Sequence, residues 1–325
     1  MRKSKKHTHI TIAVVAYFGK DLLIKTIESI LSTTPKHIHV TLLTIPNGIS
    51  LDLKTREYLK LHAVTIVPNK VEKGLTYRIK QAINQCADEF LILTQDGIGF
   101  TLTTLENTLQ SFNDEEVTIT SSKVEPSHAR SLGERVTEVR SLLKTRIGNN
   151  WRRKDNYLML NSQFIGLRMS FAAMLQIPDS VNNISTYLYL ENKHKKGKFR
   201  FVFNSLCTNQ RPQSIYSYID WRKSLESTQD EMNKHFDLNG REFNIPKLIV
   251  LESIFLEFVN RPIPTLLYFI VLTYIKATQY TFALNGKIEP IKTTVASKVI
   301  LTKSRLLKFT SVPPKRKTLR TAKQG

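Results

Sequence analysis

The stretch Glu89-Phe90-Leu91-Ile92-Leu93-Thr94-Gln95-Asp96-Gly97 decides how the chain is expected to fold. Its apolar part has the length of a strand, and it brings a single carboxylate, Asp96, to the strand end with a glycine behind it. In an open α/β sheet, ligands bind beyond the carboxyl ends of the strands, so an Asp here is expected to face a binding crevice. The same residues also fit an ordinary Asp-Gly turn after a buried strand, because both are common turn residues.

Strands and helices alternate around this stretch. Apolar, β-branched runs predict strands at residues 10–17, 40–45, 63–67, 90–94 and 117–121. Helical periodicity predicts helices at residues 19–31, 51–61, 73–86 and 102–112. In the first helix, Leu22, Ile24 and Ile27 are expected to begin the core-facing stripe. This alternation predicts an α/β fold with a mostly parallel central sheet that helices cover on both faces.

The second half of the chain is less regular. Its patterns predict helices at residues 131–145, 185–195 and 248–259, with further helical periodicity after Gln213. Two more strands are expected at residues 157–168 and 199–206. A basic segment, Asn150 to Lys154, follows the first of these helices.

Most of the net charge of +21 lies at the two ends of the chain. Residues 1–9 carry four Lys or Arg and no acid, and residues 287–325 carry eleven Lys or Arg against one Glu, a net of +10. Clustered charge of this kind favours an anionic surface, either lipid headgroups or nucleic acid. No nucleic-acid reading motif is recognisable, so no specific nucleic acid is expected as a partner.

An apolar segment precedes the basic end. Residues 261–276 hold an uninterrupted apolar run of about thirteen residues, which is short for the roughly 20 that cross a bilayer. An interfacial or re-entrant helix fits better, with both basic ends in the cytosol and the tail on anionic headgroups. An ordinary core helix followed by a basic tail is the alternative.

Several classes of protein lose support from the sequence. The only cysteines, Cys86 and Cys207, rule out a cysteine-rich zinc site and suit a reducing compartment. There is no phosphate loop and no dinucleotide glycine fingerprint. The basic start followed by residues 10–16 is not expected to be a signal peptide, because the apolar run is short and no small-x-small cleavage site follows.

The order of the motifs resembles a family 2 glycosyltransferase of the GT-A fold. The resemblance rests on residues 16–18 after the first strand, Asn47-Gly48 after the second, Lys73-Gly74 before the third helix and residues 93–97 after the fourth strand. It covers about residues 8–225, and the Thr-Gln-Asp version is similar to the branch with rhamnosyltransferase-like members. Membrane-associated members of this family act in polysaccharide and cell-envelope biosynthesis.

The resemblance divides the chain into five parts. It implies a basic arm (1–9), a nucleotide-sugar-binding half (10–121), an acceptor-side half (122–240), apolar membrane-associated helices (241–286) and a basic tail (287–325).

The resemblance also implies functional residues. Asp96 would hold Mg²⁺ or Mn²⁺ on the diphosphate of a nucleotide-sugar donor, since hard cations prefer oxygen ligands and neutralise the leaving group. The remaining expected contacts to the nucleotide sugar are Ala16, Tyr17, Asn47, Lys73, Gly74, Thr94 and Gln95. On the acceptor side, Trp221 and Arg222 are expected, and the acceptor would be lipid-linked or a polysaccharide at the cytoplasmic face of the cell membrane.

The sequence departs from the family in its acids. Pro46 and Thr94 replace acidic residues, and Ser185-Thr186 stand where inverting members present an acidic pair. An inverting transfer needs a general base for the acceptor hydroxyl, and Glu191 or Asp179 could substitute. Two hypotheses therefore remain, an active hexosyltransferase-type enzyme and a catalytically degenerate relative that serves as a membrane-bound binding or scaffold protein.

Overall fold

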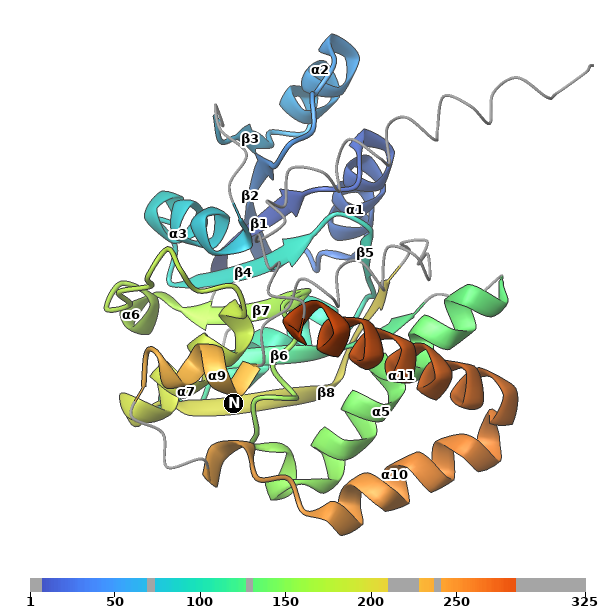
Figure 1. The fold of residues 1–325 in the computed structure, drawn as a ribbon. Coiled ribbons are helices and arrows are strands. Elements are labelled where there is room, and N and C mark those ends of the chain that lie inside the picture. The colour runs from blue at the N-terminus through green and yellow to red at the C-terminus, as the bar shows by residue number, and fades with distance from the viewer. Residues whose placement is uncertain (1–7, 69–73, 127–130, 210–227, 237–240, 285–325) are drawn as a thin grey trace, which may run out of the picture.

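The fold is built on one sheet of eight strands. A computed structural model describes residues 8–68, 74–126, 131–209, 228–236 and 241–284. In these residues the strands lie in the order β3-β2-β1-β4-β7-β6-β8-β5 (Figure 1). The α/β class predicted from the sequence is confirmed.

Most of the predicted elements are present with shifted ends. The strands are β1 (Thr8–Ala16), β2 (Ile38–Pro46), β3 (Thr65–Ile66), β4 (Phe90–Gln95), β5 (Ile98–Phe100), β6 (Val117–Pro126), β7 (Phe164–Arg168) and β8 (Lys198–Asn209). The helices are α1 (Lys20–Thr33), α2 (Leu53–Leu61), α3 (Leu75–Gln85), α4 (Thr104–Ser111), α5 (Leu132–Asn150), α6 (Met169–Ala172), α7 (Ile184–His194), α9 (Thr228–Asn233), α10 (Lys247–Asn260) and α11 (Pro262–Leu284), with 3-10 turns at η1 (Arg152–Lys154) and η2 (Arg241–Phe243). The helix expected after Gln213 begins outside the described residues.

The prediction of a mostly parallel sheet needs correction, because the sheet is mixed. β1 pairs in parallel with β2 and β4, and β6 pairs in parallel with β8. β7 runs antiparallel between β4 and β6, and β5 runs antiparallel to β8. Since β7 reverses the direction twice, β1, β2, β4, β6 and β8 all point the same way. Their carboxyl ends therefore share one edge of the sheet.

Apolar cores cover both faces of the sheet. On one face, residues of α3, α6 and α7 pack on the strands, and on the other face the packing comes from α1, α2 and α4. The core face of α1 uses Leu23, Thr26, Ile27 and Ile30. The expectation for Ile27 is confirmed, whereas that for Leu22 and Ile24 is wrong, because these two are only partly buried. Thr26 lies on this buried face because its hydroxyl oxygen accepts a hydrogen bond from the backbone N–H of Gly97, after β4, at 2.9 Å.

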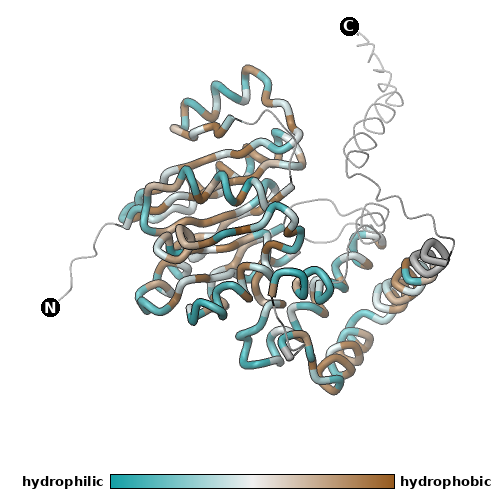
Figure 2. Tube along the Cα trace, turned by 60° about the vertical axis from the view of Figure 1, so that its left-hand side comes forward, coloured by the Kyte–Doolittle hydropathy of each residue, from teal (hydrophilic) through white to brown (hydrophobic). Residues whose placement is uncertain are grey.

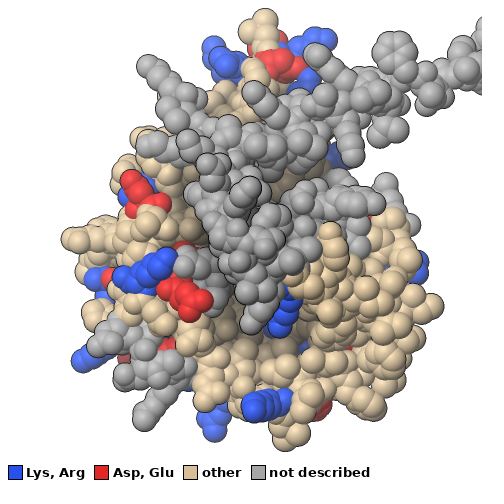
Figure 3. Space-filling view, viewed as in Figure 1, with Lys and Arg blue, Asp and Glu red and all other residues tan. Residues whose placement is uncertain are grey.

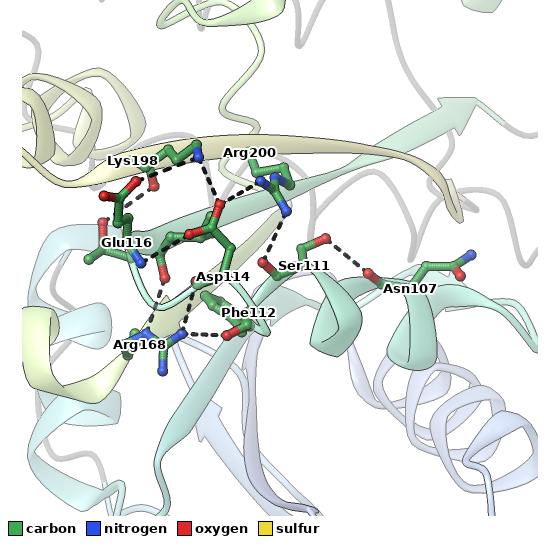
Figure 4. A network of polar contacts seen from close by, with 10 residues as sticks. Asn107, Ser111, Phe112, Asp114, Glu116, Arg168, Lys198 and Arg200 are labelled. Carbon is green, nitrogen blue, oxygen red and sulfur yellow. Dashed lines mark hydrogen bonds and ion pairs between the residues drawn. The ribbon is translucent and has the colours of Figure 1, made fainter. Parts of the chain in front are cut away.

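A charged network lies at the edge of the sheet where β6 and β8 begin, opposite the edge with the shared carboxyl ends (Figure 4). The Asp114 carboxylate pairs with Lys198 at 2.7 Å and Arg200 at 2.8 Å, both on β8. The hydrogen bond from Lys198, together with the positive charges of Lys198 and Arg200, holds the pKa of Asp114 below its usual value. At the end of β7, Arg168 donates to the carbonyl groups of Phe112, Asp114 and Val117. These groups lie at the edge away from the strand carboxyl ends. We therefore assign them a role in stabilising the fold and not in binding a ligand.

A third layer of helices lies against α5. α10 and α11 pack on α5 through a core of Val136, Val139, Leu143, Tyr268 and Ile275. Hydrophobic colouring dominates much of this helix pair, to one side of the layered sheet (Figure 2). Within the described part of the chain, no helix combines the length and the apolar character that a bilayer crossing requires.

Candidate functional site

The candidate site lies where β1, β2 and β4 end beside the start of α3. The backbone N–H of Asn47, after β2, donates to the carbonyl of Ala16 at 2.8 Å, and that of Asp96, after β4, donates to the carbonyl of Val15 at 3.1 Å. The three strand ends predicted from the sequence are therefore brought together. This is the edge at which open α/β sheets bind ligands.

Asp96 lies in an Asp-Gly turn and its side chain is buried. The residue has no exposed surface, and Oδ2 accepts hydrogen bonds from the backbone N–H groups of Phe18 at 2.6 Å and Gly19 at 3.2 Å. Gly97 follows with φ of 80°, a left-handed conformation that glycine adopts without steric cost. The carboxylate thus shapes the loop between β1 and α1, whereas the sequence led us to expect it to face an open crevice.

Thr94 and Gln95 bind the loop that precedes β7. The hydroxyl of Thr94 donates to the carbonyl of Gln163 at 3.0 Å, and the amide of Gln95 donates to the carbonyl of Ser162 at 3.2 Å. Both side chains are buried. They hold the loop before β7 against β4, and their predicted contact with a nucleotide sugar stays a prediction.

A buried arginine, Arg78, joins Asn47 in this site. Its Nε donates to Oδ1 of Asn47 at 2.9 Å, and its Nη1 donates to Oε1 of Gln81 at 2.7 Å. Arginine has no acceptor, so this contact fixes the Asn47 oxygen toward Arg78 and turns the amide NH₂ group the other way. Arg78 itself has no exposed surface. The pair presents a fixed donor set at the end of β2.

The first turn of α3 adds an open backbone position. Gly74 precedes the helix with φ of −60°, and a Cβ placed there would meet no atom of the described residues within 4 Å. The glycine is therefore not required by its own backbone or by its neighbours. A helix start with open space beside it suits an anion, because the first backbone N–H groups have no intrahelical partner.

The other predicted contacts stand as follows. Tyr17 is partly buried beside Phe18, with the two ring centroids 6.3 Å apart. Lys73, Trp221 and Arg222 lie outside the described residues.

The two predicted general bases lie in ion pairs with lysines. Glu191 pairs with Lys195 one turn further along α7, at 3.3 Å. Asp179 is largely exposed and pairs with Lys80 on α3, at 2.7 Å. The end of α7 packs by the start of β6, since Asn192 bonds to the side chain of Thr118. Glu191 is therefore carried toward the amino edge of the sheet.

Another carboxylate stands at the start of α7, where the family resemblance led us to expect acids. Glu231 of α9 is buried, and its Oε1 accepts the backbone N–H groups of Asn182 at 2.5 Å and Asn183 at 2.9 Å. Nearby, the Thr76 hydroxyl at the start of α3 donates to the carbonyl of Val181. Glu231 thus comes from a distant part of the chain to the candidate site. Its hydrogen bonds hold the backbone at the start of α7 in place.

The described residues do not fit a metal centre. Among them, no three His, Cys, Asp or Glu side chains converge. Asp96 is the nearest candidate ligand, and its Oδ2 already accepts two backbone hydrogen bonds. We therefore derive no step through a metal ion.

Comparison with known proteins shows the fold. No family model matches the chain. No curated protein matches it. Among solved structures, it is similar to the mannosyltransferase PcManGT from Pyrobaculum calidifontis, which was solved in complex with GDP-Man and Mn²⁺. The two chains are 13% identical, the match covers 93% of this chain and 81% of the other, and the TM-score is 0.50. The chain therefore has a fold that a glycosyltransferase uses, as the sequence predicted.

Sequence reasoning missed Arg78 and Glu231. Arg78 falls in the same helical stripe as Leu75 and Ala82, so a charge on the buried side of α3 was a detectable signal. No comparable signal marks Glu231, because only the tertiary fold brings its short helix to the start of α7.

Proposed function

We propose that the protein is a glycosyltransferase of the hexosyltransferase type, which moves a sugar from a nucleotide-sugar donor to a hydroxyl of an acceptor. The observation that carries the proposal is the meeting of Asn47, Arg78 and the open start of α3 at the carboxyl edge of β1, β2 and β4. The similar mannosyltransferase, solved with a nucleotide sugar, supports it. Membership in family 2 and its rhamnosyltransferase-like branch is part of the proposal.

The chemistry assigned to these residues is binding and charge stabilisation. The oriented amide of Asn47 can hydrogen-bond the polar edge of a nucleoside, and Arg78 keeps it in place. When the nucleoside diphosphate leaves, negative charge develops on its phosphate oxygens. The positive end of the α3 dipole beside Gly74 stabilises that charge without any rearrangement.

We extend the proposal to a lipid-linked or polysaccharide acceptor at the cytoplasmic face of the cell membrane. The support is the apolar character of α10 and α11 and the net charge of +10 on residues 287–325.

The proposal is tested by a screen for nucleoside diphosphate release with common UDP-, GDP- and dTDP-sugars. One donor is expected to be consumed, and faster in the presence of the acceptor. The dependence on Mg²⁺ or Mn²⁺ expected from the family resemblance stays a prediction, and addition of EDTA in the same screen checks it. Failure to release nucleoside diphosphate from any donor, with no donor bound, contradicts the proposal.

A second candidate function is a catalytically silent binding or scaffold protein. It is favoured by the ion pairs of Glu191 and Asp179 with lysines, since a paired, structural carboxylate is a weak candidate for a general base. The same screen separates the two functions. Donor binding without any release, unaffected by Glu191→Gln or Asp179→Asn, favours the silent protein.

A further inference from the structure

α10 and α11 display an apolar outer face that no described residue covers. Of the seventeen large apolar side chains that are exposed in the described residues, nine belong to these two helices. They recur every three or four residues, which places them on one side of each helix. We call this set the outer face: Leu248, Leu251, Phe255, Phe258, Val259, Ile263, Leu266, Ile270 and Tyr274.

The outer face is not a core that failed to find its partner, because the inner sides of the helices are already packed. Tyr268 and Ile275 are buried in the core shared with α5, and Ile254 of α10 packs against that core. Polar contacts fix the arrangement as well. Four charged side chains on α5, α10 and the turn before α11 form ion pairs, Arg146 with Glu257 at 3.2 Å and Arg261 with Glu138 at 2.7 Å.

Few charges interrupt the outer side of the pair. Apart from the ion-paired Glu257 and Arg261, residues 247–277 contain only Lys247, Glu252 and Lys276 as charged residues. Figure 3 shows the result as a broad uncharged surface over α10 and α11, with charged groups at its margins. Soluble monomers rarely expose contiguous apolar surface of this kind, and such patches mark interaction sites.

We propose that the outer face is the surface on which the protein docks to an anionic lipid leaflet. Two helices lying side by side can insert their apolar side chains at the depth of the headgroup and acyl boundary. The chain continues from the last residue of α11 into a segment with a net charge of +10, so the positive charge begins at the same helix pair. Stable attachment to a membrane surface takes two such signals, an apolar one and a basic one.

Charge also argues against a second copy of the chain as the occupant. A twofold contact through the outer face joins the same helices of two copies, and each α11 leads directly into its own +10 segment. These segments would repel each other near the contact, whereas an anionic leaflet attracts both. The docking surface specifies the membrane location proposed above, and it does not depend on sugar transfer.

The test measures how the full-length protein partitions onto vesicles of phosphatidylcholine alone or mixed with phosphatidylglycerol. The outer-face variant carries Leu251→Asp, Phe255→Asp and Ile270→Asp. Its matched control also adds three acids, Leu53→Asp and Leu61→Asp on α2 and Leu102→Asp before α4, at apolar residues elsewhere that are at least as exposed. We expect the outer-face variant to partition at least tenfold less onto the mixed vesicles, and the control to partition like the unaltered protein.

A third variant makes the opposite change. Glu252→Lys removes the only exposed acid of residues 247–277 and is expected to strengthen partitioning onto the mixed vesicles. Circular dichroism and thermal unfolding verify that each variant is folded. The proposal is overturned if the outer-face variant partitions like the unaltered protein, if no vesicle is bound, or if light scattering shows a dimer that the outer-face substitutions abolish. Nucleoside diphosphate release is measured separately, so failure to dock and failure of transfer are distinguishable.

Discussion

The Nε atom of Arg78 lies 2.9 Å from Oδ1 of Asn47, although the guanidinium has no exposed surface. Burying a charged group is unfavourable unless its hydrogen bonds are satisfied. Asn47 follows β2 and Arg78 lies in the first turn of α3. Their contact therefore joins two elements that are about thirty residues apart in the sequence. We infer that the contact stabilises the site as well as the fold.

The open space at Gly74 predicts a substitution that separates binding from stability. Because φ is −60° and no atom in the described part of the chain lies near the position of a Cβ, Gly74→Ala should leave the free energy of unfolding unchanged or slightly higher, by up to about 1 kcal/mol. A diphosphate that approaches this backbone would meet the new methyl group, so nucleotide affinity should fall about tenfold. Urea unfolding and calorimetric titration measure the two effects, and an unchanged affinity would place the diphosphate elsewhere.

The burial of Asp96 predicts a structural cost when its carboxylate is removed. Asp96→Ala deletes the acceptor for two backbone N–H groups and should lower the free energy of unfolding by about 1–3 kcal/mol. Asp96→Asn keeps one oxygen that can accept both hydrogen bonds, so its loss should be smaller. Urea unfolding of the two variants provides the comparison. Equal stability of Asp96→Ala and the unaltered protein would contradict the role assigned to this side chain.

Glu231 is expected to act as an anchor for α7. Glu231→Gln retains an oxygen for the N–H groups of Asn182 and Asn183, and it should keep most of the sugar transfer. Glu231→Ala should cost about 1–3 kcal/mol of stability because two buried donors lose their acceptor. The decisive comparison is the rate of Glu231→Gln at full saturation with donor. A loss of 100-fold or more in a stably folded variant would make Glu231 the general base.

The lowered pKa of Lys144 leads us to expect that the stability of the protein rises with pH. Burial lowers the pKa of its ammonium group to about 8, with the nearby charge of Arg140 adding to the effect. Between that pKa and 10.5, the ordinary pKa of a lysine, the unfolded chain binds more protons, so the free energy of unfolding increases with pH in this window. The side chain is only partly buried, so the gain should reach about 1–2 kcal/mol. Lys144→Met should abolish it in unfolding curves taken at pH 7.5 and pH 10.5, and parallel behaviour of both proteins would contradict the assignment.

The elements of the first half of the chain could be predicted because their patterns are local. The sequences of β1, β2 and β4 are apolar runs, and those of α2 and α3 show helical periodicity between them. In α1, Ile27 was predicted to face the core, but Thr26 was not, because a polar residue carries no apolar signal. β5 was not predicted, since three residues directly after a turn carry no periodic signal.

The second half of the chain was harder to predict, because its arrangement depends on contacts between residues that are far apart in the sequence. Nothing in the residues of β7 states that the strand runs antiparallel between β4 and β6. Likewise, the sequence indicated Asn47 and Asp96 as candidate site residues, but it could not show that Asp96 is held by the loop after β1. The contact of Glu231 with the start of α7 joins residues almost 50 positions apart, which no local pattern encodes.

The most direct test of the account is a calorimetric titration of the purified protein with GDP, UDP and dTDP, in the presence and absence of Mn²⁺. We predict that one nucleoside diphosphate binds with micromolar affinity and that Asn47→Ala weakens this binding at least tenfold. Lys80→Ala, on the same helix as Arg78 but bonded to Ile177 and Asp179 in the loop before α7, should bind like the unaltered protein. Absence of binding for all three nucleotides, or equal binding by Asn47→Ala, would contradict a nucleotide-sugar site at the carboxyl edge of the sheet.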